Sequence, residues 1–325
     1  MLRQNKIVFI IASVIVLLLV AVGVIVKVKH HQLPTNYRHE STKTIAVKQP
    51  TAKTNTTSSS SSISYIYLIV DENQPYSNIV NNPAAPYLNS LINKYALATN
   101  YYAVAHPSLP NYLALTSGST DGITTDCNPP SAGCIVNVPN IANEIQASGR
   151  TWKEYAESMP SNCYAYNAGE YATKHNPFVY YSNIINNASL CNSQVVPFSD
   201  LINNLSSIKT TVNYAFITPN LCNDMHDCSV ATGDAWLAKY VPIILNSKAF
   251  TTKPSLLFIT WDEGYATTNH VATILAGSAV KNGYKSGNLY SHYSLLHTIE
   301  YLWHLPALTT NDSQAPIMTN FLKVN

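Results

Sequence analysis

Two short, dense apolar runs predict strands that lie inside a sheet. The first run, I-S-Y-I-Y-L-I-V at 63–70, is rich in β-branched and aromatic residues, which is typical of a buried strand. The second run is Leu256–Thr260. Polar clusters follow both runs: Asp71-Glu72-Asn73 comes directly after the first, and Asp262-Glu263 comes after Trp261 at the end of the second.

The rest of the chain alternates between expected strands and expected helices. Strands are expected at 96–104, 214–218 and 271–276, and helices at about 85–95, 109–117, 138–148 and 291–303. This alternation predicts an α/β fold. In such sheets, ligands bind beyond the carboxyl ends of the strands. We therefore expect the two acidic clusters to meet at one edge.

Oxygen ligands at two strand ends, beside a hydroxyl, favour a divalent metal site. The alternative is that these carboxylates serve as helix caps or turn formers. The hydroxyl comes from A-H-P-S-L-P-N-Y-L-A-L-T-S-G at 105–118, where Ser108 stands at an expected strand-to-helix turn. Helix starts carry free N–H groups and attract anions, so Ser108 is a candidate nucleophile toward a phosphoryl group. The alternative is an ordinary N-cap. His106 precedes Ser108, and Asn111 follows it by one helical turn.

Other polar side chains gather in three later segments. A loop at 220–228, N-L-C-N-D-M-H-D-C, contains His226 and Asp227 and is either a rigid functional loop or a surface loop stapled for stability. His175 and His292 are each candidates for a phosphate ligand, a metal ligand or a general acid. A structural role is the alternative for both. Arg150 is the single arginine of residues 63–325, so phosphate would have to be neutralised by metal, histidines and helix N–H groups.

The amino-terminal segment differs from the rest in charge and hydrophobicity. The uncharged run Ile7–Val26 is long enough to span a bilayer, so we expect residues 1–30 to be an uncleaved anchor, with a cleaved signal as the alternative. Residues 31–62 are rich in Ser and Thr and predict a flexible linker to a single domain at 63–325. Residues 1–62 carry a net charge of +7 and residues 63–325 one of −5, which argues against a nucleic-acid partner.

All six cysteines lie in residues 63–325. An even count predicts disulfides in an oxidising compartment, and no C-x-x-C spacing supports a zinc site instead. The expected pairs are Cys127–Cys134 and Cys222–Cys228, which leaves Cys163–Cys191. The domain is therefore expected outside the membrane, at the cell surface or secreted.

Seven segments together resemble the phosphoesterase family of acid phosphatases and phospholipases C, within the alkaline-phosphatase-like superfamily. The closest likeness is to small secreted acid phosphatases, some described as phosphatidylinositol-3-phosphatases. The segments are D-E-N-Q-P-Y-S at 71–77, A-H-P-S-L-P-N-Y-L-A-L at 105–115, S-M-P-S-N at 158–162, K-H-N-P-F-V-Y-Y at 174–181, P-N-L-C-N-D-M-H-D-C-S at 219–229, T-W-D-E at 260–263 and H-Y-S-L-L-H-T-I-E at 292–300.

The resemblance implies a mostly parallel central sheet flanked by helices, and it implies a role for each matching residue. The implied metal ligands are Glu72, Asn73, Asp262 and Glu263. Ser108 matches the nucleophile and Asn111 a phosphate contact, and the pocket is lined by His106, His175, His226, Asp227 and His292. Two-metal relatives have Asp-His where this chain has Asp262-Glu263, so one divalent metal is expected rather than two.

These residues predict a metal-dependent acid phosphatase that acts on small phosphomonoesters or phospholipid headgroups. Ser108 attacks phosphorus to give a phosphoserine that water hydrolyses, and His292 or His226 protonates the leaving oxygen. A phospholipase C with the same site is the alternative enzyme, although its relatives usually carry extra modules. An alternative of another class is a surface-anchored binding module with a silent site.

Overall fold

The computed structural model describes residues 63–265 and 267–323. These residues form a nine-stranded sheet. Its order is β4-β3-β5-β1-β6-β7-β2-β8, and β9 also pairs with β2. The strands are β1 (Tyr65–Asp71), β2 (Ala96–Tyr102), β3 (Trp152–Ala156), β4 (Val195–Pro197), β5 (Tyr214–Thr218), β6 (Ser255–Trp261), β7 (His270–Ala276), β8 (Tyr284–Ser286) and β9 (Tyr290–Ser291).

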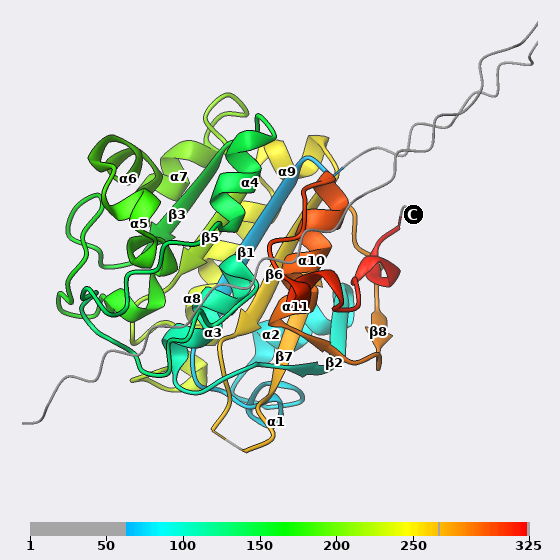
Figure 1. Ribbon diagram of the computed structural model, residues 1–325. Helices are drawn as coiled ribbons and strands as arrows, with labels where there is room; N and C mark the ends of the chain where they lie inside the picture. The colour runs from blue at the N-terminus through cyan, green and yellow to red at the C-terminus, as the bar shows by residue number, and fades with distance from the viewer. Residues whose placement is uncertain (1–62, 266, 324–325) are drawn as a thin grey trace, which may run out of the picture. The chain divides into compact units, whose positions relative to one another are not determined.

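Helices cover both faces of the sheet (Figure 1). On the near face α3 packs on α10, and on the far face α2 packs on α8. The helices are α1 (Tyr76–Ile79), α2 (Pro86–Lys94), α3 (Ser108–Ser117), α4 (Ile141–Ala147), α5 (Ser182–Ile185), α6 (Ala188–Gln194), α7 (Ser199–Leu205), α8 (Val230–Leu245), α9 (Lys248–Thr252), α10 (His292–Trp303) and α11 (Thr310–Ser313), with 3₁₀ turns at Thr173–His175, Pro177–Tyr180 and Thr319–Phe321.

The two central strands explain the apolar runs. Every residue of β1 and β6 is buried, because both strands lie inside the sheet and helices cover its two faces. β1 runs parallel to β5 and β6, and β7 alone is antiparallel to its neighbours. β2 therefore runs in the same direction as β1 and β6. The carboxyl ends of these three strands share one edge of the sheet.

The predicted α/β fold with a mostly parallel sheet is confirmed. The predicted disulfides Cys127–Cys134, Cys163–Cys191 and Cys222–Cys228 are confirmed as well. The expected anchor at 1–30 and linker at 31–62 lie outside the described residues. Within the described residues, no helix combines the length and hydrophobicity that a membrane crossing requires.

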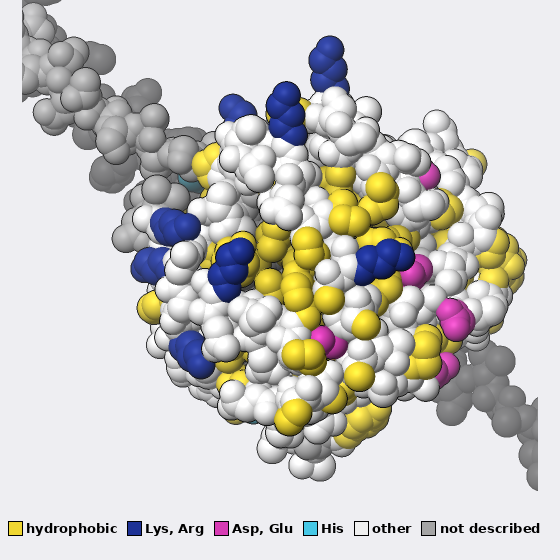
Figure 2. Space-filling model, turned by 180° about the vertical axis from the view of Figure 1, so that it is seen from behind, with side chains coloured by type: hydrophobic (Ala, Val, Ile, Leu, Met, Phe, Trp, Pro, Cys, Tyr) yellow, Lys and Arg dark blue, Asp and Glu magenta, His cyan; other side chains and the backbone are white. Residues whose placement is uncertain are grey.

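The surface is poor in charge. On the face opposite to the view of Figure 1, Lys and Arg side chains are scattered among apolar and uncharged polar ones, and few acidic side chains are visible (Figure 2). This agrees with a chain in which 11% of the residues are charged. Several buried titratable groups lie instead at the carboxyl edge of the sheet, among them Asp71, Glu72 and Asp262.

Candidate active site

The two acidic clusters meet at the carboxyl edge of β1 and β6. Asp71 pairs with Trp261 in the last register position of these strands, so Glu72 and Asp262 leave the sheet side by side. Two hydrogen bonds hold the two clusters together: Asp262 N–H donates to the Asp71 carbonyl at 2.9 Å, and Asn73 N–H donates to the side-chain Oδ1 of Asp262 at 3.0 Å. Neighbouring parallel strands thus turn two clusters that are distant in sequence into one polar centre.

Ser108 faces this centre. It is the first residue of α3, it is 1% exposed, and its Oγ donates to Glu72 Oε2 at 3.0 Å. The N-cap position belongs to Pro107, which has no capping side chain. The hydroxyl is therefore bonded to a carboxylate rather than to the free N–H groups of the helix. The N-cap interpretation of Ser108 does not describe this geometry.

Glu72 is the most connected carboxylate of the centre. Its Oε1 accepts from the Tyr112 hydroxyl at 2.6 Å and lies 3.1 Å from His175 Nε2. The other ring nitrogen of His175 lies 3.2 Å from Asp224 Oδ2. Burial, and then the charge of Asp262, raise the pKa of Glu72 well above its usual value, and burial lowers the pKa of His175 well below its own.

The loop at 220–228 closes over Glu72. The Cys222–Cys228 disulfide joins its ends, and Glu72 N–H donates to the Asp224 carbonyl at 2.8 Å. His226 Nδ1 lies 2.6 Å from Asp227 Oδ1. Ligand atoms of Glu72, His175 and His226 all lie within 4.8 Å of one another, which is close enough for one metal ion. The loop therefore places Asp224 and His226 near Glu72, and the disulfide restricts their positions.

Asp262 and Glu263 complete the acidic centre. Burial, and then the charge of Glu263, raise the pKa of Asp262 to about 7. Burial, and then the charge of Asp126, raise the pKa of Glu263 to about 7. Asp262 Oδ2 is buried, and no described residue hydrogen-bonds to it. Buried carboxylates are normally paired or bound to metal, so the orphan oxygen of Asp262 is compatible with a cation. The ligand atoms that the described residues gather within 4.8 Å are those of Glu72, His175 and His226, so the predicted set Glu72, Asn73, Asp262 and Glu263 stays a prediction.

Two predicted residues have other surroundings than expected. Asn111 is fully buried, and its side chain is engaged by backbone: Oδ1 accepts from Val104 and Ala105 N–H, and Nδ2 donates to the Ala105 and Pro107 carbonyls. This amide holds the segment that presents Ser108, and its polar atoms do not point to a substrate. These contacts favour a structural role for Asn111, and the phosphate contact stays a prediction.

His292 is also fully engaged. Its Nε2 lies 2.7 Å from the Asp262 carbonyl oxygen, to which it donates, and its Nδ1 lies 3.0 Å from the Tyr101 hydroxyl. The ring is completely buried, and burial lowers its pKa to about 4. In this geometry both ring nitrogens are engaged, and Nε2 contacts the backbone of Asp262. The arrangement favours a positioning role for His292, and the general-acid role stays a prediction.

His106 has the opposite character. Its Nδ1 contacts Glu263 Oε2, and its side chain is 49% exposed. Within the described residues nothing hydrogen-bonds to its Nε2. His106 stands two positions before Ser108 in the same segment, and its half-exposed ring is anchored to Glu263 through Nδ1.

Sequence reasoning overlooked Tyr112, Asp126 and Lys174. Lys174 Nζ lies 3.0 Å from Asp126 Oδ2 and 3.4 Å from His226 Nε2. Tyr112 stacks on the His175 ring, with centroids 5.5 Å apart. Their sequence neighbours could have indicated two of these residues. Lys174 precedes His175, and Tyr112 follows Asn111 in the segment that carries Ser108.

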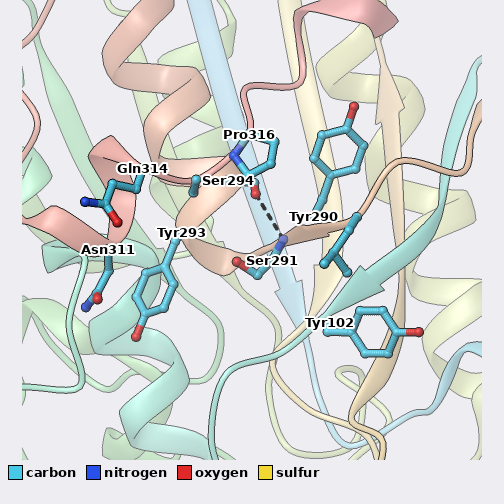
Figure 3. A pocket seen from close by; sticks show the side chains of 10 residues that line it. Tyr102, Tyr290, Ser291, Tyr293, Ser294, Asn311, Gln314 and Pro316 are labelled. Atoms are coloured by element: carbon cyan, nitrogen blue, oxygen red, sulfur yellow. Dashed lines mark hydrogen bonds between the residues drawn. The ribbon is translucent and has the colours of Figure 1, made fainter.

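A cavity of about 450 Å³ is lined by Ser291 and Tyr293, the sequence neighbours of His292, but by none of the predicted site residues. Figure 3 shows Tyr102, Tyr290 and Tyr293 around it, with Ser291 N–H donating to Ser294 Oγ. Its lining has hydroxyl and amide groups and no titrating carboxylate, histidine or cysteine. The reactive groups therefore lie outside this cavity.

The α/β fold is like that of alkaline-phosphatase-superfamily structures. A Vibrio parahaemolyticus protein described as belonging to the alkaline phosphatase superfamily matches with a TM-score of 0.53 and 13% identity, over 79% of this chain and 71% of that chain. The lipoteichoic acid synthase LtaP from Listeria monocytogenes matches with a TM-score of 0.55 and 9% identity, over 78% and 76%. These likenesses establish the fold.

The chain belongs to the Phosphoesterase family, whose profile matches residues 70–306. It is a hydrolase that acts on phosphoric ester bonds. It is 36% identical to "Phosphatidylinositol-3-phosphatase" of Mycobacterium tuberculosis over 79% of this chain and 82% of that protein. It is 32% identical to "Probable acid phosphatase" of Kluyveromyces lactis over 78% of this chain, and it spans 61% of that relative. The resemblance inferred from the motifs is confirmed.

Proposed function

We propose that the chain is an acid phosphatase that hydrolyses phosphate monoesters through a phosphoserine intermediate on Ser108. The observation that carries the proposal is the hydrogen bond from the buried Ser108 hydroxyl to the Glu72 carboxylate, 3.0 Å long. A hydroxyl bonded to a base and presented at a helix start is the arrangement of an activated nucleophile. The relatives that are named acid phosphatases support the reaction type.

The acidic centre is proposed to hold one divalent cation. Glu72, Asn73, Asp262 and Glu263 would supply oxygen donors, and the orphaned Asp262 Oδ2 supports the assignment of Asp262. His175 and His226 are near enough to Glu72 to contribute nitrogen donors. When bound, the cation would lower the pKa of the hydroxyl and neutralise charge on the phosphoryl group.

Chain residues account for the proton transfers of the proposed reaction. Ser108 Oγ forms a bond to phosphorus while the ester P–O bond breaks, and Glu72 Oε2 lies where it can accept the hydroxyl proton. His106 Nε2 gives a proton to the leaving oxygen, and Glu263 orients the ring through Nδ1. In the second half, His106 takes a proton from the attacking water. The phosphorus–serine bond then breaks, Glu72 Oε2 returns the proton to Ser108 Oγ, and inorganic phosphate is released.

The proposal extends to substrate and location. The 36% identical relative is named for a phosphoinositide, which supports a phospholipid headgroup as one substrate. Three disulfides support a domain outside the cytoplasm, and the apolar run Ile7–Val26 supports a membrane anchor that keeps lipid headgroups within reach.

Phosphate release tests the proposal directly. We expect the full-length chain in detergent micelles to release phosphate from p-nitrophenyl phosphate and from phosphatidylinositol 3-phosphate, with more activity at acidic than at alkaline pH. Phosphatidylcholine vesicles serve as the control substrate. Release of diacylglycerol from these vesicles, without phosphatase activity, would favour a phospholipase C. No turnover of any ester with added divalent cations would favour a binding module.

A further inference from the structure

Lys174 brings a positive charge to a centre that is otherwise acidic. It lies in the 3₁₀ turn Thr173–His175, which packs against α3, and its side chain is 13% exposed. An ammonium group has three N–H donors. One is directed at Asp126 and one at His226 Nε2. Within the described residues nothing accepts the third, so Lys174 retains a donor for an oxygen that comes from outside the protein.

Asp126 ties this ammonium to the nucleophile. Its Oδ2 pairs with Lys174, and its Oδ1 accepts from the backbone N–H of Leu109 at 3.2 Å. Leu109 follows Ser108 directly. One carboxylate therefore links the lysine to the residue next to the reacting hydroxyl. The Cys127–Cys134 disulfide begins at the next residue after Asp126 and restrains this carboxylate further.

The contact between Asp126 and Leu109 N–H also weakens the positive potential at the start of α3. The first turn of α3 would ordinarily offer several free N–H groups to an anion. Here Leu109 N–H is used by Asp126, and Pro110 has no N–H. Arg150, the single arginine of residues 63–325, lies over the Trp303 ring, 5.1 Å from its centroid. Among the described residues, Lys174 is the only Lys or Arg paired with a carboxylate.

We infer that Lys174 makes the site selective for phosphomonoesters over phosphodiesters, with Asp126 as its positioning residue. The inference rests on the proposed phosphatase function. In an in-line transfer the transition state carries three equatorial oxygens. In a monoester none of the three is esterified and all share the charge, whereas in a diester one carries a carbon substituent. The free N–H of Lys174 therefore gains more from a monoester transition state, because charge-assisted hydrogen bonds are about twice as strong as neutral ones.

Two substrates with the same leaving group isolate this effect. The full-length chain, in detergent with divalent cation present, is assayed on p-nitrophenyl phosphate and on bis-p-nitrophenyl phosphate. We expect Lys174→Met to lower kcat/KM for the monoester by roughly 100- to 1,000-fold, the range for losing one transition-state donor. The diester should fall by no more than about tenfold, because it lacks the third unesterified oxygen. Lys174→Arg should retain part of the preference, since the charge remains.

Matched variants separate selectivity from folding. Lys153→Met serves as the control, because Lys153 contacts the Ser193 carbonyl on another part of the fold. It should keep the parental ratio of the two activities. Asp126→Asn should reduce the ratio less than Lys174→Met does. Equal losses on both substrates in Lys174→Met, with an unchanged melting temperature, would overturn the inference.

Binding of inorganic phosphate keeps the two proposals distinguishable. We expect Lys174→Met to weaken phosphate binding, measured by calorimetry, by at least about tenfold, in line with one lost charge-assisted contact. A wild type that hydrolyses neither ester but binds phosphate through Lys174 would contradict the phosphatase and leave Lys174 as an anion ligand. Unchanged phosphate binding in Lys174→Met would overturn the inference whether or not the chain is active.

Discussion

His292 Nε2 donates to the backbone carbonyl of Asp262 at 2.7 Å. The contact fixes the tautomer of the ring, because Nδ1 must then accept from the Tyr101 hydroxyl. Burial keeps the ring neutral by lowering its pKa to about 4. His292 thus holds an acidic strand end in place, while the half-exposed ring of His106 contacts Glu263 two positions before Ser108 in the chain.

This division of roles predicts that variants of His106 and His292 depend differently on the leaving group of the substrate. His106→Gln should lower kcat/KM for an alkyl phosphate, such as glycerol phosphate, by roughly 100- to 10,000-fold, the usual contribution of a general acid. It should affect kcat/KM for p-nitrophenyl phosphate far less, because p-nitrophenolate leaves without a proton and kcat/KM does not include the later hydrolysis of the phosphoserine. His292→Ala should lower both activities by a similar factor, about 10- to 100-fold, as expected for a residue that orients a metal ligand. Equal losses on both substrates in His106→Gln would remove its assignment as the acid.

Removing the metal should abolish activity and reduce stability. Without a cation, Glu72, Asp262 and Glu263 keep their mutual repulsion in a buried site. We expect a chelator to eliminate phosphatase activity and to lower the melting temperature, and we expect added divalent cation to restore both. Asp262→Asn should lose most of the cation-induced rise in melting temperature. Full activity after exhaustive chelation would contradict the proposed metal site.

The disulfides should differ in what they stabilise. Cys222–Cys228 closes a loop of separation 6 that carries His226, whereas Cys163–Cys191 has a separation of 28. Chain-entropy arguments give about 2 kcal/mol for the short loop and about 4 kcal/mol for the long one. Replacing both cysteines of the short loop by Ala should therefore cost less stability but more activity. Chemical denaturation and kcat/KM are measured on both double variants. If the same variant lost more stability and also more activity, the prediction would be wrong.

Glu300 should make the fold less stable as pH rises. Burial, and then the charge of Asp312, raise its pKa from 4.5 to about 9. A raised carboxyl pKa favours the protonated form in the folded state, so its contribution is complete below pH 4.5 and is lost as pH rises through about 9. Glu300→Gln should show a smaller fall in melting temperature between acidic and alkaline pH than the wild type. If the melting temperatures of Glu300→Gln and the wild type fell equally with pH, groups other than Glu300 would cause the pH dependence.

Much of the central fold could be predicted from the sequence, because its signals are local. The runs at 63–70 and 256–260 are continuous and apolar because β1 and β6 are covered on both faces. The convergence of Glu72 and Asp262 follows from parallel pairing alone. β3 was missed because Trp152–Ala156 contains Lys153 and Glu154, and nothing local reveals that Glu154 is buried against the Thr218 hydroxyl.

The roles of individual side chains could not be predicted, because they depend on tertiary partners. Asn111 looked like a phosphate contact one turn after Ser108, but four backbone groups occupy its amide. The sequence favours His292 as a general acid, but it does not reveal that the ring contacts the Asp262 carbonyl and the Tyr101 hydroxyl. Lys174 acquires its role from Asp126, which lies 48 residues away. A hydrogen bond of this range leaves no periodic pattern in a sequence.

Trapping the covalent intermediate tests the central claim most directly. The full-length chain is mixed with p-nitrophenyl phosphate, quenched in acid within the first turnovers and digested for mass spectrometry. Ser108 alone should carry a phosphoryl group, and Ser108→Ala should carry none, remain folded and lose activity by at least about 1,000-fold. Wild-type turnover in Ser108→Ala, or a phosphoryl group on a different residue, would contradict the account.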